Sequence, residues 1–218
     1  MSARLALPAL ALALVAACST GPAVPDWRLN AAGHVDRYRS AWLEGNERVA
    51  AIEFQAARGE TARTGRPDWV ARVELNRCAV RVASLDFSPC AGFDTLAADA
   101  TPEERAYARY LAGQAGAADV ALLPASQRAV AAGQSDLDAI DDPLARLVAA
   151  GVLLRRERIT PLQVDEAVAT ASRWGWSRPL LAWLGVQRRL AEQHGDHAGA
   201  ARVQRQIDLV RLPAHPAH

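Results

Sequence analysis

The chain of 218 residues contains no lysine, so all 25 of its basic residues are arginine. The absence of lysine excludes the P-loop lysine of nucleotide-binding proteins, a Schiff-base lysine and a Ser-x-x-Lys nucleophile pair. The arginines are balanced by 24 acidic residues, which leaves a formal net charge of +1. We expect no nucleic-acid partner, because such binding depends largely on the neutralisation of phosphates.

Long apolar runs and the alternating pattern of β-strands are also missing. The longest apolar run, Leu5–Ala17, has 13 residues and one proline. It falls short of the roughly 20 residues that a membrane-spanning helix needs. Half of all residues are nevertheless apolar and 22% are charged, a composition typical of a globular domain and too apolar for a disordered one.

The first residues have the pattern of an export signal. Arg4 supplies a positive charge, the apolar run follows, and it ends in Val15-Ala16-Ala17-Cys18. This segment resembles the lipobox of bacterial lipoproteins, in which the cysteine accepts a diacylglyceryl group and becomes the first residue of the mature protein. The resemblance implies a signal peptide over residues 1–17 and a lipidated Cys18. An ordinary secretory signal with an incidental cysteine is the alternative.

The lipobox also carries information about location. In Gram-negative lipoproteins an aspartate just after the cysteine usually retains the protein at the inner membrane, and here that position is Ser19. The resemblance therefore implies the outer membrane, with the chain on its periplasmic face and the bilayer as a partner through the lipid anchor. Residues 18–25, which include two prolines, are expected to be the lipidated cysteine and a short tether.

The rest of the chain has the periodicity of successive helices. Apolar residues recur at three- and four-residue spacing, as in Ala200, Val203 and Ile207. We expect an all-α fold of antiparallel helical hairpins in a single compact layer over residues 26–212, followed by a flexible tail, 213–218. The expected helices span 27–43, 47–63, 67–85, 92–99, 102–113, a weak 124–132, 143–158, 161–174, 178–193 and 197–211.

Helix start signals agree with this pattern. Thr101 and Thr160 each precede a proline and stand three residues before Glu104 and Gln163, the spacing of a capping box. Asp142 and Asp26 are expected to be N-cap residues. In the helix over 67–85, a stripe that starts at Ala71 is accompanied by a second stripe through Val73 and Val80, so that helix is expected to be covered on both sides.

Two of the expected hairpins resemble the tetratricopeptide repeat. In the first, Gly45 at the turn is followed by Ala50, Phe54 and Ala57, the small–large–small spacing of the second helix of that repeat. The second begins at Gly195-Asp196. The resemblance covers about a third of the chain and implies a TPR-like or α-solenoid-like architecture. As a whole, the chain after Cys18 also resembles small Ala- and Arg-rich helical lipoproteins of Gram-negative bacteria, a group with no assigned activity.

Two cysteines remain once Cys18 is assigned to the lipid. The periplasm is oxidising, so an even pair of cysteines there is expected to form a disulfide. Cys78 lies late in the helix over 67–85, and Cys90 follows Pro89 in the loop that leaves it. A bridge between them would close a loop of about 13 residues and stabilise the fold by about 3 kcal/mol. The alternative is a buried thiol at Cys78 and an unpaired Cys90.

Tryptophan and arginine supply the candidate binding surface. Six tryptophans outnumber three phenylalanines, and an indole can stack on a sugar or peptide while its N–H donates a hydrogen bond. Trp174 and Trp176 flank Gly175, and we expect their rings to point in different directions, with at least one exposed. The alternative for the tryptophans is packing between helices.

Arginines gather at four candidate positions, Arg155, Arg156, Arg188 and Arg189. They form either an ordinary solvated face or a patch that meets lipopolysaccharide, peptidoglycan or an acidic partner.

No metal and no cofactor are expected. His194, Asp196 and His197 lie at a helix–helix turn where the aspartate has a structural role, and structural zinc requires four convergent ligands. The adjacent acids at 103–104 and 141–142 lie at expected helix starts, where the helix dipole favours negative charge. They are not expected to form a catalytic pair.

The sequence does not assign a biochemical activity, and it leaves three hypotheses open. The first is a binding or scaffolding lipoprotein whose partner is an envelope protein or a cell-wall component. The alternative is a hydrolase of envelope material, which would join Asp86 or Asp94 to a glutamate of a neighbouring helix. The third is a carrier of a small ligand in a cavity lined by tryptophan.

Overall fold

The computed structural model of the chain describes residues 24–134 and 136–212. Over these residues the fold is all-α and contains no strand, which confirms the expected fold class. The elements are α1 (Asp26–Leu43), α2 (Glu47–Ala62), α3 (Pro67–Ala83), α4 (Ala91–Asp94), α5 (Pro102–Leu111), the 3₁₀ helix η1 (Ala117–Leu122), α6 (Ala125–Ala131), α7 (Pro143–Arg155), α8 (Pro161–Arg173), α9 (Ser177–Gln193) and α10 (His197–Val210).

Most helices begin where their capping residues predict. Thr101 and Thr160 both form complete capping boxes, at the starts of α5 and α8. Asp142 accepts a hydrogen bond from the backbone N–H three residues later, at the start of α7. The prediction for Asp26 is wrong: it is the first residue of α1, and Pro25 occupies the cap position without a side-chain hydrogen bond. Its carboxylate lies in the first turn, where the helix dipole favours it.

The connection between α3 and α5 departs most from the sequence-based expectation. The helix predicted over 92–99 is a single turn, α4, because the chain leaves it through hydrogen bonds of shorter span such as that from the Leu96 N–H to the Phe93 carbonyl. The η1 helix was not predicted. The expected ends of α3 and α7 are also too late, since Leu85 and Glu157 have positive φ angles of 59° and 55° and stop the helices.

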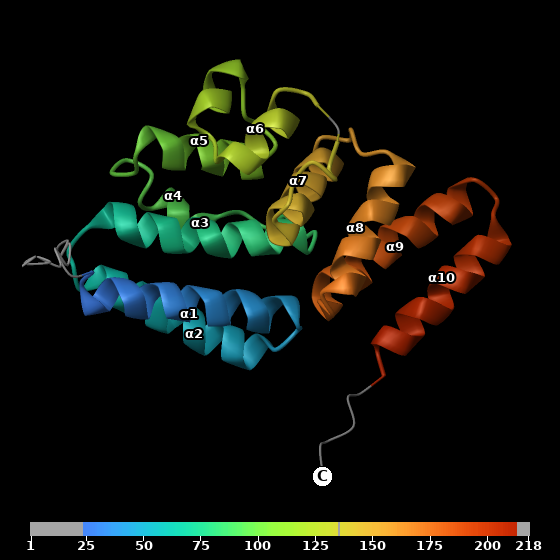
Figure 1. The fold of residues 1–218 in the computed structure, drawn as a ribbon, viewed down its shortest axis with the longest axis horizontal. Coiled ribbons are helices and arrows are strands. Elements are labelled where there is room, and N and C mark those ends of the chain that lie inside the picture. The colour runs from blue at the N-terminus through green and yellow to red at the C-terminus, as the bar shows by residue number, and fades with distance from the viewer. Residues whose placement is uncertain (1–23, 135, 213–218) are drawn as a thin grey trace, which may run out of the picture.

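Helix α3 is the centre of the molecule. Its Ala71 and Leu75 belong to the main apolar cluster, together with residues of α5, α6 and α7. On the other side, Val73 and Val80 pack with Phe54 of α2 and with α1. Figure 1 shows α1 and α2 on one side of α3, with α5 and α6 on the other. The prediction that this helix is covered on both sides is confirmed, and α4–α6 form a second row beyond it.

The first predicted hairpin has the expected buried face. Ala50, Phe54 and Ala57 of α2 are all buried, and α2 packs against α1 and α3. The small residues allow the helices to approach, and the phenylalanine fills the space between them. The likeness to a tetratricopeptide repeat stays a prediction, because α4, η1 and α6 interrupt any regular succession of hairpins.

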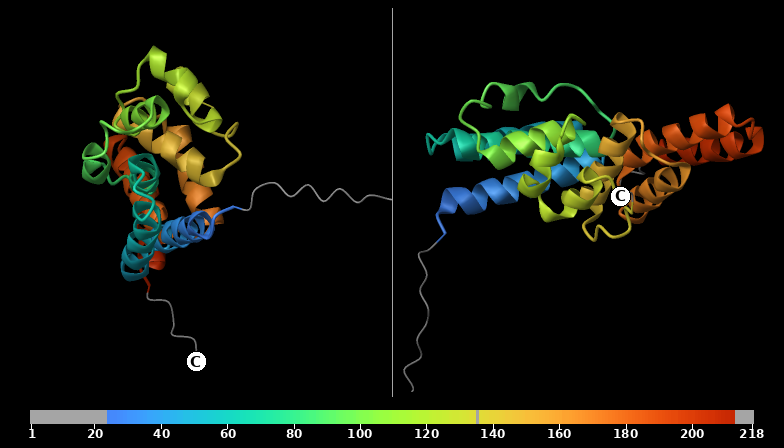
Figure 2. Two further views of the ribbon diagram at one scale, coloured as in Figure 1. Left: turned by 90° about the vertical axis from the view of Figure 1, so that its left-hand side faces the viewer. Right: turned by 90° about the horizontal axis from the view of Figure 1, so that it is seen from above.

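The C-terminal helices are joined to the first hairpin at one end. Where α9 begins, the Ser177 hydroxyl donates to the Glu44 carbonyl at 2.8 Å, and Arg178 Nε donates to the Trp42 carbonyl at 2.8 Å. From there α9 packs against α8 and α10, and α10 lies at the far end of the molecule from α1 to α6 (Figure 2). No described helix has both the length and the apolar character needed to cross a bilayer.

Candidate functional site

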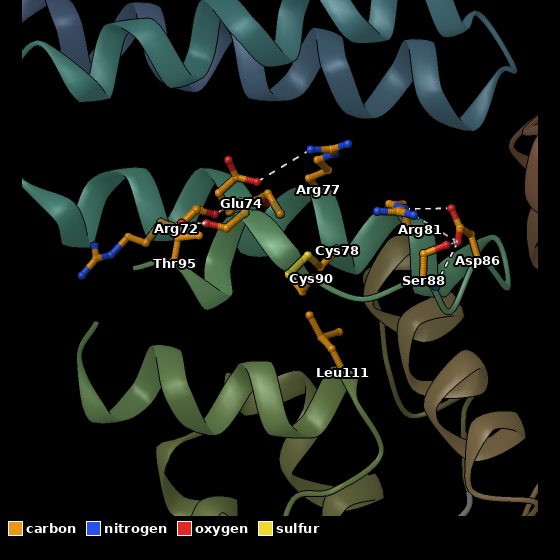
Figure 3. The surroundings of a disulfide bond; sticks show 12 residues. Arg72, Glu74, Arg77, Cys78, Arg81, Asp86, Ser88, Cys90, Thr95 and Leu111 are labelled. Atoms are coloured by element: carbon orange, nitrogen blue, oxygen red, sulfur yellow. Dashed lines mark hydrogen bonds and ion pairs between the residues drawn. A yellow bond between two sulfur atoms is a disulfide. The ribbon is translucent and has the colours of Figure 1, made fainter. Parts of the chain in front are cut away.

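The two cysteines of the fold are joined. Cys78 of α3 and Cys90, which precedes α4, form a disulfide with a Cα–Cα distance of 5.8 Å (Figure 3). This distance lies within the usual range for disulfides. The bridge fastens the short α4 segment to the central helix, and the predicted pairing is confirmed. Cys18 lies outside the described residues.

A small cavity of about 230 Å³ opens beside the disulfide. Its floor is apolar and includes both cysteines and Leu111, which points toward the bridge in Figure 3. Asp94 and Arg155 contribute charge to its lining. The guanidinium of Arg155 lies 5.4 Å from the Phe87 ring centroid, and it donates to the Leu111 carbonyl at 3.3 Å. Arg155 is therefore engaged with the protein itself.

Of the other three predicted arginines, only Arg156 lies beside Arg155, since the stems of both stand over Gly113. The stem of Arg156 lies over Gly113, where an added Cβ would meet its Cγ at 3.2 Å. Arg188 donates to Gln204 of α10 at 3.1 Å. Arg189 is exposed on α9. Arg155 and Arg156 thus lie beside Gly113, after the end of α5, whereas Arg188 lies against α10.

The tryptophans at the α8–α9 turn behave differently from the prediction. Trp174 and Trp176 stack with ring centroids 5.7 Å apart and an interplanar angle of 27°, so the expectation that their rings diverge is wrong. Gly175 between them has a φ of 66°, and this turn brings the two rings to the same side. Trp174 is 56% exposed, which confirms the expected exposure of one ring.

The two aspartates that the hydrolase hypothesis requires are not available as an acid–base pair. Partial burial disfavours the charged form of Asp86, but hydrogen bonds from Arg81 and Ser88 outweigh it and lower its pKa to about 2. A carboxylate with this pKa is a poor proton donor or acceptor near neutrality. Asp94 is exposed and has no carboxylate beside it in its cavity lining.

The histidine turn shows no arrangement of metal ligands. Over residues 24–134 and 136–212, no three His, Cys, Asp or Glu side chains lie close enough together to hold a metal ion. His194 Nδ1 lies 2.7 Å from the Leu190 carbonyl, and Asp196 caps α10 through the Gly199 N–H.

A larger hollow surface lies elsewhere, across α3, and sequence reasoning missed it. It consists of three adjoining hollows that all include Asn76 in their lining. We call them together the α3 groove. Helix α1 forms one wall, α5 with η1 forms the opposite wall, and α7 lies at one end. The two larger parts, which share Arg72 and Asn76, are the Trp cavity and the apolar trough.

The Trp cavity has a volume of about 290 Å³ and lies between α1 and α3. Trp27 and Trp69 meet there edge to face, with centroids 5.2 Å apart. It is lined by Trp27, Arg28, Ala31, Ala32, Val35, Asp36, Arg39, Thr61, Trp69, Arg72, Val73 and Asn76.

Positive charge dominates the Trp cavity. The guanidinium groups of Arg28 and Arg72 lie 4.9 Å and 4.8 Å from the Trp69 ring centroid, distances typical of cation–π contacts. With Arg39, three cations line the cavity against one acid, Asp36. Arg72 also donates to Glu104 at 2.7 Å, whereas Arg28 has no acidic partner among the described residues.

Two donor groups of the same residues are unmatched. Among the described atoms, neither Trp69 Nε1 nor Arg39 Nε has a hydrogen-bond acceptor, although both atoms are buried. Buried donors almost always have a hydrogen-bond acceptor. Two buried donors without one, both from residues that line the Trp cavity, indicate that the protein itself supplies too few acceptors there. Together with the excess of cations, they make the Trp cavity favourable for negative charge.

The apolar trough is the larger hollow, with a volume of about 480 Å³. Its floor is formed by Leu75 of α3, Tyr107 of α5, and Leu122 to Pro124. Burial raises the pKa of Tyr107 to about 12, so its hydroxyl stays protonated. Thr101, Glu103 and Glu104 lie along the other edge, and Arg72 neutralises Glu104.

The sequence contained one signal for this groove. Trp27 is followed directly by Arg28, and Trp69 lies three residues from both Arg66 and Arg72. The separation of 42 positions between the two tryptophans gave no reason to place them in contact. Their meeting depends on the packing of α1 against α3.

The chain matches no protein-family model, no curated protein and no solved structure.

Proposed function

We propose that this chain is a lipid-anchored binding module of the outer membrane that faces the periplasm and binds an envelope component through the α3 groove. The observation that carries the binding role is the groove itself, a set of adjoining hollows that share Arg72 and Asn76, with tryptophan and arginine lining one and mainly apolar side chains lining the next. Ligand sites are typically concave, largely apolar and furnished with a few polar groups.

Two further observations support export and anchoring. The lipobox-like segment ends at Cys18, and Val24 is the sixth residue after it. Because an extended chain spans about 3.5 Å per residue, lipid on Cys18 would hold the start of α1, eight residues after it, within about 28 Å of the bilayer. The Cys78–Cys90 disulfide suits the oxidising periplasm, where such bonds persist.

A second candidate function, carriage of a small ligand, is favoured by the Trp cavity. Its volume of about 290 Å³ lies near the lower end of the range for small-molecule sites. A scaffold for a protein partner would be expected to use a broader and flatter surface.

The anchor and the binding role can be tested separately. Cells that express the chain are labelled with palmitate, and their membranes are fractionated; we expect label in the outer membrane and none in a Cys18→Ser variant. For binding, a photo-crosslinking amino acid replaces Ala32 at the groove or, as the control, Ala201 on the exposed face of α10. Adducts, detected by gel and intact mass, are expected at position 32 only. Reproducible absence of adducts there would contradict the binding role.

A further inference from the structure

The two ends of the α3 groove have opposite chemical character. The Trp cavity presents Arg28, Arg39 and Arg72 with a single acid in its lining. The apolar trough, which begins at Arg72 and Asn76, continues along Leu75 and Tyr107 to the end of η1. A ligand that fills both parts therefore needs a negative group at one end and an apolar body at the other.

The cationic end is suited to a carboxylate or phosphate. Arginine donates two parallel hydrogen bonds to either group, and charge-assisted bonds of this kind are stronger than neutral ones. Arg28 is exposed and has no acid to displace among the described residues. Arg72 keeps its bond to Glu104 through Nε, which leaves other guanidinium donors for a ligand. The guanidinium groups of both arginines lie over the neighbouring Trp69 ring.

The apolar end is suited to an alkyl chain and poorly suited to a polypeptide. A peptide strand brings N–H and C=O groups that need partners, whereas the walls of the trough are helices whose backbone groups are engaged within the helices. Leu75 and Leu123 are 4% and 1% exposed, so a chain lying above them would contact a firmly packed floor. Each methylene placed there contributes favourably without any directional requirement.

We infer that the α3 groove binds a single-chain anionic amphiphile, with its acidic head in the Trp cavity and its alkyl chain along the apolar trough. This inference rests on the proposed function, since it takes the groove to be the binding surface of the module. It names the ligand class: an alkyl chain that ends in a carboxylate or a phosphate, as a fatty acid or a lysophospholipid fragment does.

The test uses the full chain as cells produce it, purified and reconstituted into phosphatidylcholine nanodiscs. The probe is an alkyl carboxylate with a diazirine in its chain, compared with alkyl phosphate, alcohol and trimethylammonium probes of the same chain length. Labelled peptides are mapped by mass spectrometry. We expect the two anionic probes to label Leu75, Tyr107 and residues 122–124 about tenfold more than the neutral probe, the scale of one charge-assisted contact. The ratio of carboxylate to phosphate labelling identifies the preferred head.

Two variants separate the site from partition into the nanodisc. Arg28→Gln removes an exposed cation, and it is expected to lower labelling by the anionic probes about fivefold; Arg205→Gln, an exposed arginine on α10, is the matched control and should leave labelling unchanged. Ala32→Phe fills the mouth of the Trp cavity, where Ala32 is exposed, and should abolish the preference for anionic probes. Thermal unfolding of each variant checks that it is folded.

Several outcomes would overturn the inference. The anionic and neutral probes could label the chain equally, or the label could be concentrated outside the α3 groove. The third such outcome is that Arg28→Gln and Ala32→Phe are both labelled as strongly as the unchanged chain. Failure of the anchor is visible separately, as a chain without palmitate. A further outcome is possible, in which photo-adducts at position 32 contain another polypeptide and the anionic probes show no preference. This outcome would support the groove as a binding surface and refute the inference that its ligand is an amphiphile.

Discussion

The Cys78–Cys90 disulfide provides the sharpest test of the fold and of its compartment. The bridge ties the α4 segment to α3, beside the cavity that includes Leu111. Reduction leaves every other contact of the folded chain available and releases the constraint on the unfolded chain. The reduced protein should therefore remain folded and lose stability by the entropy of the released loop.

The size of the loss follows from the length of the closed loop. The two cysteines are separated by 12 positions, and loop closure of this length corresponds to about 3 kcal/mol at 25 °C. For a chain of about 200 residues, each kcal/mol lowers the midpoint of thermal unfolding by about 2–4 °C. We therefore expect reduction to lower that midpoint by about 6–12 °C.

The assay compares thermal unfolding with and without a reductant, followed by circular dichroism. A Cys78→Ala/Cys90→Ala variant is the control, since it should unfold near the temperature of the reduced protein and be insensitive to reductant. Thiol counting in denatured, unreduced protein is the companion measurement, and neither residue should react. Two reactive thiols, or identical unfolding curves with and without reductant, would refute the reasoning.

Three more predictions concern single side chains. Gly151→Ala should cost about 1–3 kcal/mol, because the new Cβ would collide with a backbone carbonyl of α3. Gly185→Ala is the control: its new Cβ would meet only the end of the Arg189 side chain, at 3.9 Å, so it should be neutral or stabilising in urea titrations. Trp183→Phe should cost about 1–3 kcal/mol in the same assay, because its buried N–H donates to the Ala83 carbonyl at 3.1 Å. The pKa of Asp86 is lowered to about 2. The stabilisation that its ionised carboxylate adds to the folded state is therefore fully present above about pH 4, the ordinary pKa of an aspartate, and is lost as the pH falls toward 2. Asp86→Asn should flatten the curve of unfolding free energy against pH over this range.

Local sequence signals predicted the helices well where each signal is contained in one helix. The capping boxes at Thr101 and Thr160 depend on residues three positions apart, and both were found as expected. The two stripes of α3 correspond to two separate apolar clusters. The α4 region failed because its helical pattern is overridden by the disulfide and by the burial of Phe93.

The candidate site was harder to predict, because its residues come from several helices. Cys78 and Cys90 were paired correctly, since they are close in sequence and few alternatives exist. The arginines at 155 and 188 looked alike in sequence, yet one packs on an aromatic ring and the other bonds α10. Clusters of one residue type do not reveal which helices become neighbours.

The sequence by itself determined that this protein is a series of amphipathic helices with defined starts, since spacing and capping act over three or four residues. It also favoured the Cys78–Cys90 disulfide over two unpaired thiols, and the structure decided between them. Only the tertiary structure decided that α1 and α5 stand on either side of α3 with a hollow between them. The positions of Arg28, Trp69 and Tyr107 around that hollow depend on how helices far apart in the chain pack, and no local pattern encodes that packing.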